Sequence, residues 1–302
     1  MVAEVRYGVE TIDHIAIPVR ALAANRSFYV DVLGLKHKTA RRHSDGTARG
    51  TCVTAGANAI VLHLPGVAAG ASPSPAPRVG IGVSAELWAR VLRNLEASHC
   101  IFRGPIEHGE EEPLERSIYF DDPDGNHLEV CVRRREPFGE CISHVVFETR
   151  EIKKAITFYA ESLGAGVPLS CGSETMIPVR NGQMIGLVEV AELSERSMTH
   201  HRGCYMAMDV PHADFDSMVA LIKHYGGRTQ GDHPTLKRLG PEGERSIYFF
   251  DPDNNRLQIV APRPERKDEL PSDREKWRRL LASRTEQAPG VNRWEAGGKK
   301  FL

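Results

Sequence analysis

One fifteen-residue phrase occurs twice in the chain with a change of chemistry near its end. RSIYFDDPDGNHLEV covers 116–130 and RSIYFFDPDNNRLQI covers 245–259, so the carboxylate of Glu129 corresponds to the amide of Gln258. A carboxylate brings charge that offsets a divalent cation, whereas an amide offers only a neutral oxygen. A histidine also recurs, because His14 and His144 each lie 14 residues before a phenylalanine. Imidazole and carboxylate groups can both bind metal ions. We interpret the phrase as the last strand of a metal-binding unit, with Glu129 as a ligand candidate.

The elements that position these residues are duplicated as well. DHIAIPVRALAANRSFYVDVLGL (13–35) matches SHVVFETREIKKAITFYAESLGA (143–165), and a charged, turn-rich joint lies near 134–140. Within each half, alternating apolar residues predict strands, and DPDG or DPDNN between two β-rich runs predicts a tight turn. Helices are expected over 21–33 and 85–97. The pattern predicts four βαβββ modules, at 11–65, 78–133, 141–191 and 203–261.

Two homologous domains are therefore expected along the sequence. The first spans 11–135 with the first two modules, and the second spans 141–262 with the other two. Ser272 and Glu275 have the spacing of a capping box before a short basic helix. The segment 263–302 is accordingly predicted to be a helical, charged tail that docks on the body or on a dimer partner.

Composition narrows the class of protein. The chain has 302 residues, 41% of them hydrophobic, and a net charge of −1, with its charges interspersed, so nucleic acid is not an expected partner. Six cysteines without a CxxC pair favour reduced thiols. Early charges such as Glu4 and Arg6 argue against a signal peptide, and no apolar run is long enough to span a membrane. We expect a cytoplasmic globular protein.

The paired modules resemble a known superfamily. The first-strand histidine, the FY…LGL run and SIYF.DPDGN.LE are similar to the vicinal oxygen chelate superfamily over nearly all of 11–261. That group includes glyoxalases, extradiol ring-cleaving dioxygenases and bleomycin- or fosfomycin-resistance proteins. The resemblance implies an α+β fold with cup-shaped mixed sheets around a divalent metal, whose ligands come from the first and last strands of the modules. It does not fix one reaction.

In the first half, the resemblance implies a ligand set of two imidazoles and one carboxylate. His14 lies on the first strand, His63 lies in VLHLP, and Glu129 lies on the last strand of the second module. Such a set suits Fe(II), with Mn, Ni or Zn as alternatives. Arg78 falls at the remaining first-strand position, where it stays protonated and cannot ligate. It could instead hold an anionic substrate.

The second half implies an alternative set. His144, Glu189 in GLVEV and Gln258 occupy the matching positions, with Tyr205 where a histidine is common in the family. Pairing of modules across the halves is also known in the family and would bring His144 near Glu129. The sequence leaves this pairing open.

Further residues near these positions have candidate roles. The resemblance implies that Tyr119, ten residues before Glu129, hydrogen-bonds a substrate oxygen, although a core tyrosine is the alternative. Tyr248 has the same spacing to Gln258, and Tyr248 and Tyr205 are further candidate substrate contacts. His108 is a candidate general acid or base on a loop, where a solvated histidine is the alternative. His127 shares a strand face with Glu129 and is a candidate substrate contact, supporting residue or replacement ligand.

Three functions follow from the resemblance. The first is an extradiol-type dioxygenase that cleaves a catechol-like aromatic compound. The second is a glyoxalase-like isomerase or lyase acting on a dicarbonyl-type substrate. The third is a metal-free small-molecule-binding protein, favoured by Arg78, Tyr205 and Gln258 at ligand positions. A homodimer is also expected on grounds of symmetry.

Overall fold

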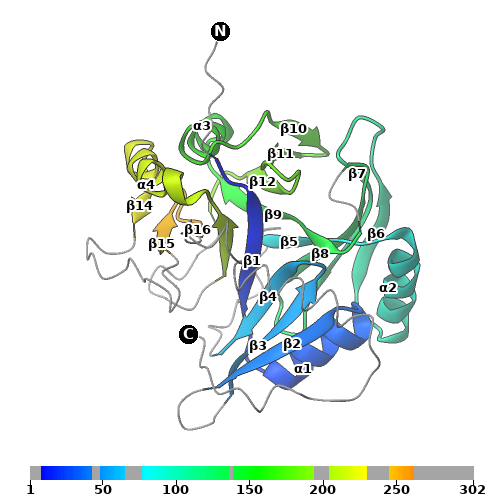
Figure 1. Cartoon of the computed structure of the whole chain (residues 1–302). Helices are drawn as coiled ribbons and strands as arrows, with labels where there is room; N and C mark the ends of the chain where they lie inside the picture. Colours follow the sequence, from blue (N-terminus) through cyan, green and yellow to red (C-terminus); the bar gives the residue numbers. More distant parts are fainter. Residues whose placement is uncertain are drawn as a thin grey trace, which may run out of the picture.

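The computed structural model describes residues 8–42, 48–64, 77–135, 139–193, 204–229 and 245–261. No helix in these ranges is long and apolar enough to cross a membrane. The predicted tail helix and most of the 65–77 linker lie outside the described residues. The elements in chain order (Figure 1) are β1 (Thr11–Pro18), α1 (Leu22–Ser27), the π-helical turn η1 (Phe28–Val32), β2 (Lys36–Arg42), β3 (Ala48–Ala55), β4 (Asn58–His63), β5 (Arg78–Gly82), α2 (Ala85–Ala97), β6 (Phe102–Glu107), β7 (Leu114–Asp121), β8 (His127–Arg133), β9 (Cys141–Thr149), α3 (Ile152–Leu163), β10 (Leu169–Cys171), β11 (Glu174–Pro178), β12 (Met184–Glu189), β13 (Tyr205–Asp209), the 3-10 turn η2 (His212–Asp214), α4 (Phe215–His224), β14 (Arg228–Thr229), β15 (Arg245–Phe250) and β16 (Arg256–Ala261).

The predicted four-module α+β fold is confirmed. Each module contributes one main helix and four strands, in the order β1–β4, β5–β8, β9–β12 and β13–β16. Helix α2 has the predicted limits and begins at Ser84, whose hydroxyl accepts a hydrogen bond from the Leu87 amide. The helix predicted over 21–33 is interrupted, because α1 passes into a π-helical turn at Phe28.

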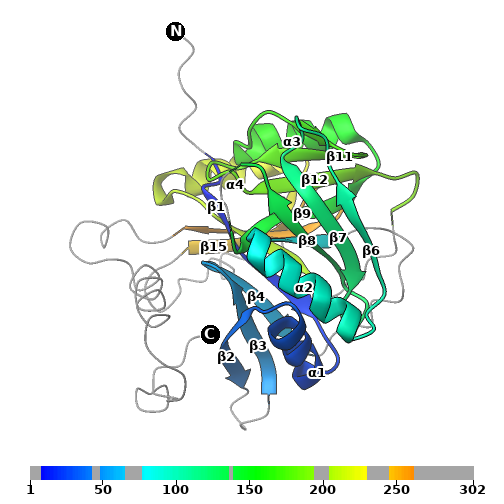
Figure 2. The same ribbon diagram turned by 90° about the vertical axis from the view of Figure 1, so that its right-hand side faces the viewer.

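The strands form two eight-stranded sheets, and each sheet combines modules from both halves of the sequence. Sheet A has the order β14-β15-β16-β13-β1-β4-β3-β2, and sheet B has the order β10-β11-β12-β9-β5-β8-β7-β6. The two sheets and their curvature are visible in Figures 1 and 2. The junctions are antiparallel pairs of first strands, β1 with β13 and β5 with β9. The hydrogen-bonded units therefore differ from the consecutive halves expected from the sequence.

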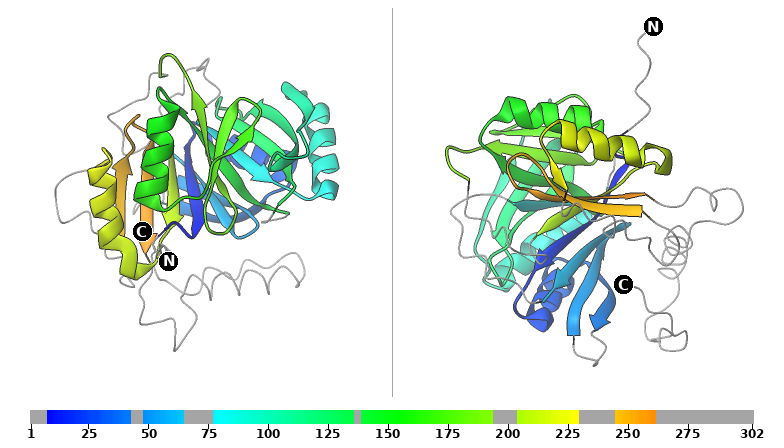
Figure 3. Two further views of the ribbon diagram at one scale, coloured as in Figure 1. Left: turned by 90° about the horizontal axis from the view of Figure 1, so that it is seen from above. Right: turned by 90° about the vertical axis from the view of Figure 1, so that its left-hand side faces the viewer.

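Modules of the same half are joined by helices and turns instead. In the first half, the Tyr29 hydroxyl donates to Asp122 in the DPDG turn at 3.2 Å. In the second half, the Tyr159 hydroxyl donates to Asp251 in the DPDNN turn at 2.7 Å. Helices α3 and α4 lie side by side in Figure 3. In both copies of the repeated phrase, the turn thus accepts a hydrogen bond from a tyrosine in the helical segment of the preceding module.

Strand alternation gives each sheet one apolar face and one chemically richer face. Along β8, Leu128 and Val130 enter the main core with Ile15 of β1, whereas the intervening Glu129 points to the opposite side. We name the face of sheet B that carries Arg78, Glu129 and His144 cup B. The corresponding face of sheet A, which carries His14, Tyr205 and Gln258, is named cup A.

Candidate functional site

The predicted metal ligands of the first half are divided between the two sheets. His14 and His63 lie on β1 and β4 of sheet A, whereas Glu129 lies on β8 of sheet B. The grouping of these three residues into one centre is therefore corrected. The physical reason is that β5 pairs with β9 rather than with β1, which brings His144 to Glu129. This is the cross-half pairing that the sequence left open.

The predicted set of the second half is divided as well. His144 lies in sheet B and Gln258 lies in sheet A. Glu189 ends β12, is exposed, and accepts a hydrogen bond at 3.0 Å from the Ile152 amide. It therefore stabilises the start of α3, because the first amides of a helix have no partner within the helix. His144, Glu189 and Gln258 do not form one site.

A buried ionic cluster forms the base of cup B. Both Arg78 Nε, at 2.9 Å, and His144 Nε2, at 3.1 Å, contact Oε2 of Glu129. The other oxygen of Glu129 accepts from the Ser117 hydroxyl at 2.7 Å. Gly80 lies between Glu129 and His144 in the sheet, and a Cβ there would lie 2.2 Å from the His144 ring. The absence of a side chain at this position lets the imidazole reach the carboxylate.

A second carboxylate joins this cluster from β11. Both oxygens of Glu174 accept from Nη2 of Arg78 at 2.6 Å. Burial alone would lower the pKa of Arg78, but the negative charges of Glu129 and Glu174 raise it above its ordinary value. Burial would raise the pKa of Glu129, yet the charges of His144 and Arg78 and the hydrogen bonds from His144 and Ser117 lower it to about 2. Arg78 and Glu129 are therefore an ion pair at neutral pH.

The residues of this cluster do not fit the divalent ion that the superfamily resemblance implies. His144 and Glu129 have suitable chemistry, and with Cys131 they form a buried group whose ligand atoms lie within 4.8 Å of one another. However, the first-strand position on β5 holds a guanidinium, which cannot coordinate and which already neutralises Glu129. A dication here would be repelled by a buried cation 2.9 Å from its carboxylate ligand.

Tyr119 lies directly above the ion pair, as its pairing opposite Glu129 requires. Its ring is flanked by the guanidinium groups of Arg78 and Arg103, each 5.0 Å from the ring centroid. Burial and the charge of Glu129 raise the pKa of Tyr119, and Arg78 only partly offsets this. The phenol therefore stays protonated and can donate a hydrogen bond. A hydrogen bond from Tyr119 to a substrate oxygen stays a prediction.

His108 is linked to the buried cluster rather than solvated. It follows β6, and its Nε2 contacts the Ser117 hydroxyl at 2.9 Å while its Nδ1 contacts Glu112 at 3.0 Å. Because Ser117 donates its single proton to Glu129, the hydroxyl must accept from His108. His127, in contrast, contacts Asp121 at 2.6 Å at the other end of the cup.

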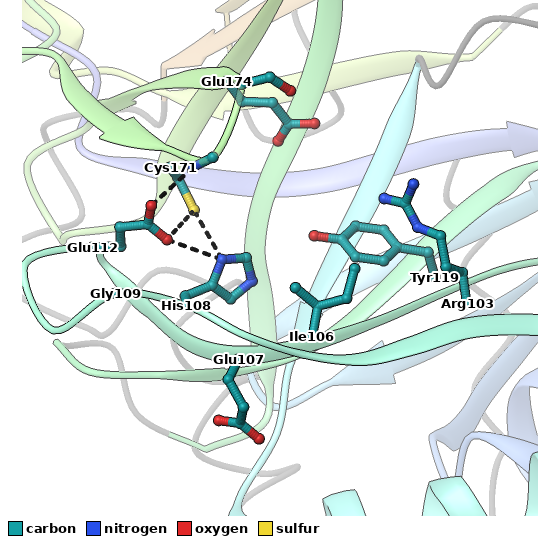
Figure 4. A pocket seen from close by; sticks show the side chains of 11 residues that line it. Arg103, Ile106, Glu107, His108, Gly109, Glu112, Tyr119, Cys171 and Glu174 are labelled. Carbon is teal, nitrogen blue, oxygen red and sulfur yellow. Dashed lines mark hydrogen bonds and ion pairs between the residues drawn. The ribbon is translucent and has the colours of Figure 1, made fainter.

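Two cavities meet at Tyr119 and Arg103. The first has a volume of about 260 Å³ and includes His108, Cys171 and Glu174 in its lining. The second, of about 600 Å³, extends past His127. Figure 4 shows the Tyr119 hydroxyl, the His108 ring and the Glu174 carboxylate pointing into the first cavity from different sides, whereas the Glu107 carboxylate points away. Cup B therefore gathers polar groups around a space for a small molecule.

Cup A is built from aromatic rings and one cation. The hydroxyl of Tyr205 lies 3.3 Å from His14 Nε2 and 3.4 Å from the hydroxyl of Tyr248. The Arg256 guanidinium lies 5.1 Å and 4.7 Å from the ring centroids of Tyr205 and Tyr248. Oε1 of Gln258 is buried and has no hydrogen-bond partner among the residues that the structure describes. Tyr205 and Tyr248, which were predicted to contact substrate, therefore lie in cup A. The other two predicted substrate contacts, Arg78 and His127, lie in sheet B.

Several residues of cup B were not predicted from the sequence. Glu174 and Cys171 lie in β11 and β10, which carry no repeated motif. Cys171 has no CxxC partner, so its spacing in the sequence did not indicate a site. Ser117 stands in the repeated phrase and was overlooked because Ser246 recurs with it. Glu112 lies four residues after His108, and this His-x3-Glu spacing is a local signal that could have indicated the pocket.

Comparisons with known proteins agree with the fold. Residues 11–130 match the model described as the Glyoxalase/Bleomycin resistance protein/Dioxygenase superfamily. A putative dioxygenase from Bacillus subtilis superposes with a TM-score of 0.64 at 18% identity, covering 95% of this chain and 99% of that one. Glyoxalase I from Zea mays gives a TM-score of 0.61 at 15% identity, covering 94% and 98%. At these identities, the two structures share the fold.

Proposed function

We propose that cup B is an enzyme active site. The match of residues 11–130 to the model of the Glyoxalase/Bleomycin resistance protein/Dioxygenase superfamily and the fold shared with a putative dioxygenase support this proposal. The reaction that its groups support best is a proton transfer on a small carbonyl compound, of the glyoxalase-like isomerase or lyase type. The observation that carries this proposal is the first cavity, where a protonated phenol and a carboxylate point into one space.

Each group has a role that follows from its surroundings. Tyr119, whose pKa is raised, donates a hydrogen bond to the substrate oxygen that gains negative charge. Glu174 takes the proton from the adjacent carbon and returns it to the neighbouring position, so that no oxidant is required. Arg78 fixes the Glu174 carboxylate by two hydrogen bonds at 2.6 Å. Arg103 supplies further positive charge beside the Tyr119 ring.

Proton exchange between substrate and solvent tests this assignment. The full chain is incubated in D2O with a panel of dicarbonyl hemithioacetals and hydroxyketones, and NMR follows deuterium at the carbon beside the carbonyl. We expect Glu174→Gln to lower the exchange rate by about 100-fold or more and Tyr119→Phe by about 10- to 100-fold. Glu107→Gln is the matched control, because that carboxylate points out of the pocket. Equal rates of deuterium exchange in wild type and Glu174→Gln would contradict the proposal.

The extradiol reaction predicted from the sequence remains an alternative proposal. It needs a metal centre with open positions, and the predicted set of His14, His63 and Glu129 is divided between two sheets. Oxygen uptake with a panel of catechols distinguishes it from proton transfer, which consumes no oxygen. Cup A, with its edge-to-face pair of tyrosines and the guanidinium of Arg256 beside both rings, favours metal-free binding of a planar compound as a second role for the chain.

A further inference from the structure

Three potential metal ligands of different chemical types converge at the mouth of cup B. Nδ1 of His108 lies 3.0 Å from Oε2 of Glu112 and 3.8 Å from Sγ of Cys171, and the last two atoms are 4.0 Å apart. Figure 4 shows the triangle that these atoms form at one side of the first cavity. This group does not include Glu129 or His144.

The separations are close to those of ligands around one zinc ion. Bond lengths of about 2.0 Å to nitrogen or oxygen and about 2.3 Å to sulfur, at tetrahedral angles, place such ligand atoms roughly 3.3–3.6 Å apart. The three observed distances of 3.0, 3.8 and 4.0 Å differ from these values by about half an ångström or less. Imidazole, thiolate and carboxylate together are a ligand set that zinc accepts.

The atoms of His108 and Glu112 that face away from the triangle have supporting hydrogen bonds. Nε2 of His108 contacts the Ser117 hydroxyl at 2.9 Å, which leaves Nδ1 facing the other two ligands. Oε1 of Glu112 accepts from the Gly172 amide at 3.0 Å, which leaves Oε2 toward Cys171. Outer hydrogen bonds of this kind orient the ligands of protein metal sites. The ligand atoms are therefore already aimed at a common point.

We propose that His108, Glu112 and Cys171 bind a zinc-type divalent ion whose fourth position is open to the first cavity. Burial and the negative charges of Glu112, Glu129 and Glu174 raise the pKa of Cys171 to about 12. A dication held between the three ligand atoms would offset the negative charge of Glu112 and keep the sulfur of Cys171 as a thiolate. An ion with an open position could polarise a substrate oxygen in the same pocket as Tyr119.

The site also has a structural consequence for sheet B. His108 and Glu112 follow β6, and Cys171 ends β10, and these strands are the two opposite edges of the sheet. The curl of the sheet brings the edges together at this point (Figure 2). A bound ion would fasten one edge to the other. The proposal concerns the pocket of the proposed reaction but does not depend on that reaction.

Metal binding by the full chain tests the site without substrate. Chelator-treated protein is titrated with Zn²⁺, with metal content as the stoichiometric readout, and with Co²⁺, whose thiolate charge-transfer absorption reports sulfur ligation. We expect one ion per chain and a thiolate band. Cys171→Ala should abolish the band and weaken binding by about 100-fold or more. Cys131→Ala and Glu107→Gln are matched controls and should bind as wild type does.

Two outcomes would overturn the assignment. One is loss of the band in Cys131→Ala with its retention in Cys171→Ala, which would move the ion to the buried group around Glu129. The other is wild type without a thiolate band. Should Cys171→Ala fail to fold, mass spectrometry of wild type follows alkylation of Cys171 with and without Zn²⁺, and unchanged alkylation contradicts the site. Zinc binding without proton exchange would contradict only the proposed reaction.

Discussion

Cup A and cup B occupy equivalent positions in the two sheets but differ in how they balance charge. By strand register, Gln258 corresponds to Glu129, Tyr205 to Arg78, His14 to His144, and Ala207 to Gly80. In cup B the buried cation bonds two carboxylates. In cup A the cation is Arg256, stacked on two tyrosines.

The difference shows how equivalent faces of two sheets in one scaffold can carry two kinds of chemical groups. A guanidinium with two carboxylates leaves the base of cup B polar and fixed, which suits a reaction with developing charge. A guanidinium over aromatic rings leaves cup A more apolar, which suits binding of a planar molecule. The exchange of Glu for Gln in the repeated phrase accompanies the movement of the arginine from the first strand to the last.

The largest expected change in the free energy of unfolding comes from replacing the arginine of each cup. Arg78→Met would leave the Glu129 and Glu174 carboxylates without their shared partner in the interior. We expect the free energy of unfolding to fall by about 3–5 kcal/mol, since breaking a buried ion pair leaves an uncompensated charge. Arg256→Met removes mainly stacking, and about 1–2 kcal/mol is expected. Urea unfolding followed by circular dichroism measures both, and equal losses would show that the two cups do not differ in this way.

A carboxyl group should contribute to stability with opposite sign in the two cups, because the ionised form of Glu129 is stabilised in cup B, whereas an ionised carboxyl group at position 258 in cup A would be destabilised. The pKa of Glu129 is lowered to about 2, so its stabilisation is full above its ordinary value near 4.5 and is lost as the pH falls toward 2. Glu129→Gln should therefore cost about 2–4 kcal/mol at pH 7, and this cost should shrink on acidification. Urea unfolding at a series of pH values measures the difference.

Gln258→Glu is the reciprocal variant. Oε1 of Gln258 has no hydrogen-bond partner among the described residues, so a carboxylate there is buried without a donor to one oxygen. We expect a cost of about 1–3 kcal/mol at pH 7. Burial raises the folded pKa of such a carboxyl, so the cost should disappear as the pH falls below that pKa. Both costs should shrink on acidification but in different pH ranges: the cost of Glu129→Gln below its ordinary pKa near 4.5, and the cost of Gln258→Glu already above that value. A cost of Gln258→Glu that changes only in the acidic range of Glu129→Gln would contradict the proposed difference between the cups.

Much of the fold could be predicted from the sequence because its signals are local. Strand alternation, the limits of α2 and the Asp-Pro-Asp turns depend on neighbouring residues, and Gly125 and Asn254 adopt the positive φ that these turns need. The pairing of modules could not be predicted, since all four first strands have similar apolar patterns. Either β5 or β13 could form backbone hydrogen bonds with the edge of β1. Packing of the whole chain determines that β13 does so.

The candidate site could be predicted only in part, because its residues come together through the pairing of modules, which the sequence does not specify. Glu129 and His144 stand in repeated motifs and were identified singly, but their contact depends on the pairing of β5 with β9. Glu112 and Cys171 come from opposite edges of sheet B, and only the curl of the sheet brings them together. No pattern along the sequence encodes that contact.

The smallest expected difference concerns the small residue that lies between two facing strands in each cup. Gly80 lies between His144 and Glu129 in cup B, and Ala207 lies between His14 and Gln258 in cup A. A methyl group at Gly80 would lie 2.2 Å from the buried His144 ring, so the ring must move and its bond to Glu129 must lengthen. We expect Gly80→Ala to cost about 1–3 kcal/mol, the usual range for overpacking. In cup A the corresponding Ala207→Gly creates no clash and should cost about 0.5–1 kcal/mol from backbone entropy.

NMR of the His144 imidazole protons, together with urea unfolding, separates these two effects. In Gly80→Ala the His144 resonances should shift, since the contact with Glu129 is lost, whereas Ala207→Gly should leave them unchanged. If Gly80→Ala were as stable as wild type with unchanged His144 resonances, the glycine would not be what allows the histidine to reach Glu129. The contact between His144 and Glu129 would then depend on the curvature of sheet B alone. In that case, replacing Ala207 by glycine could not bring His14 to Gln258 in cup A.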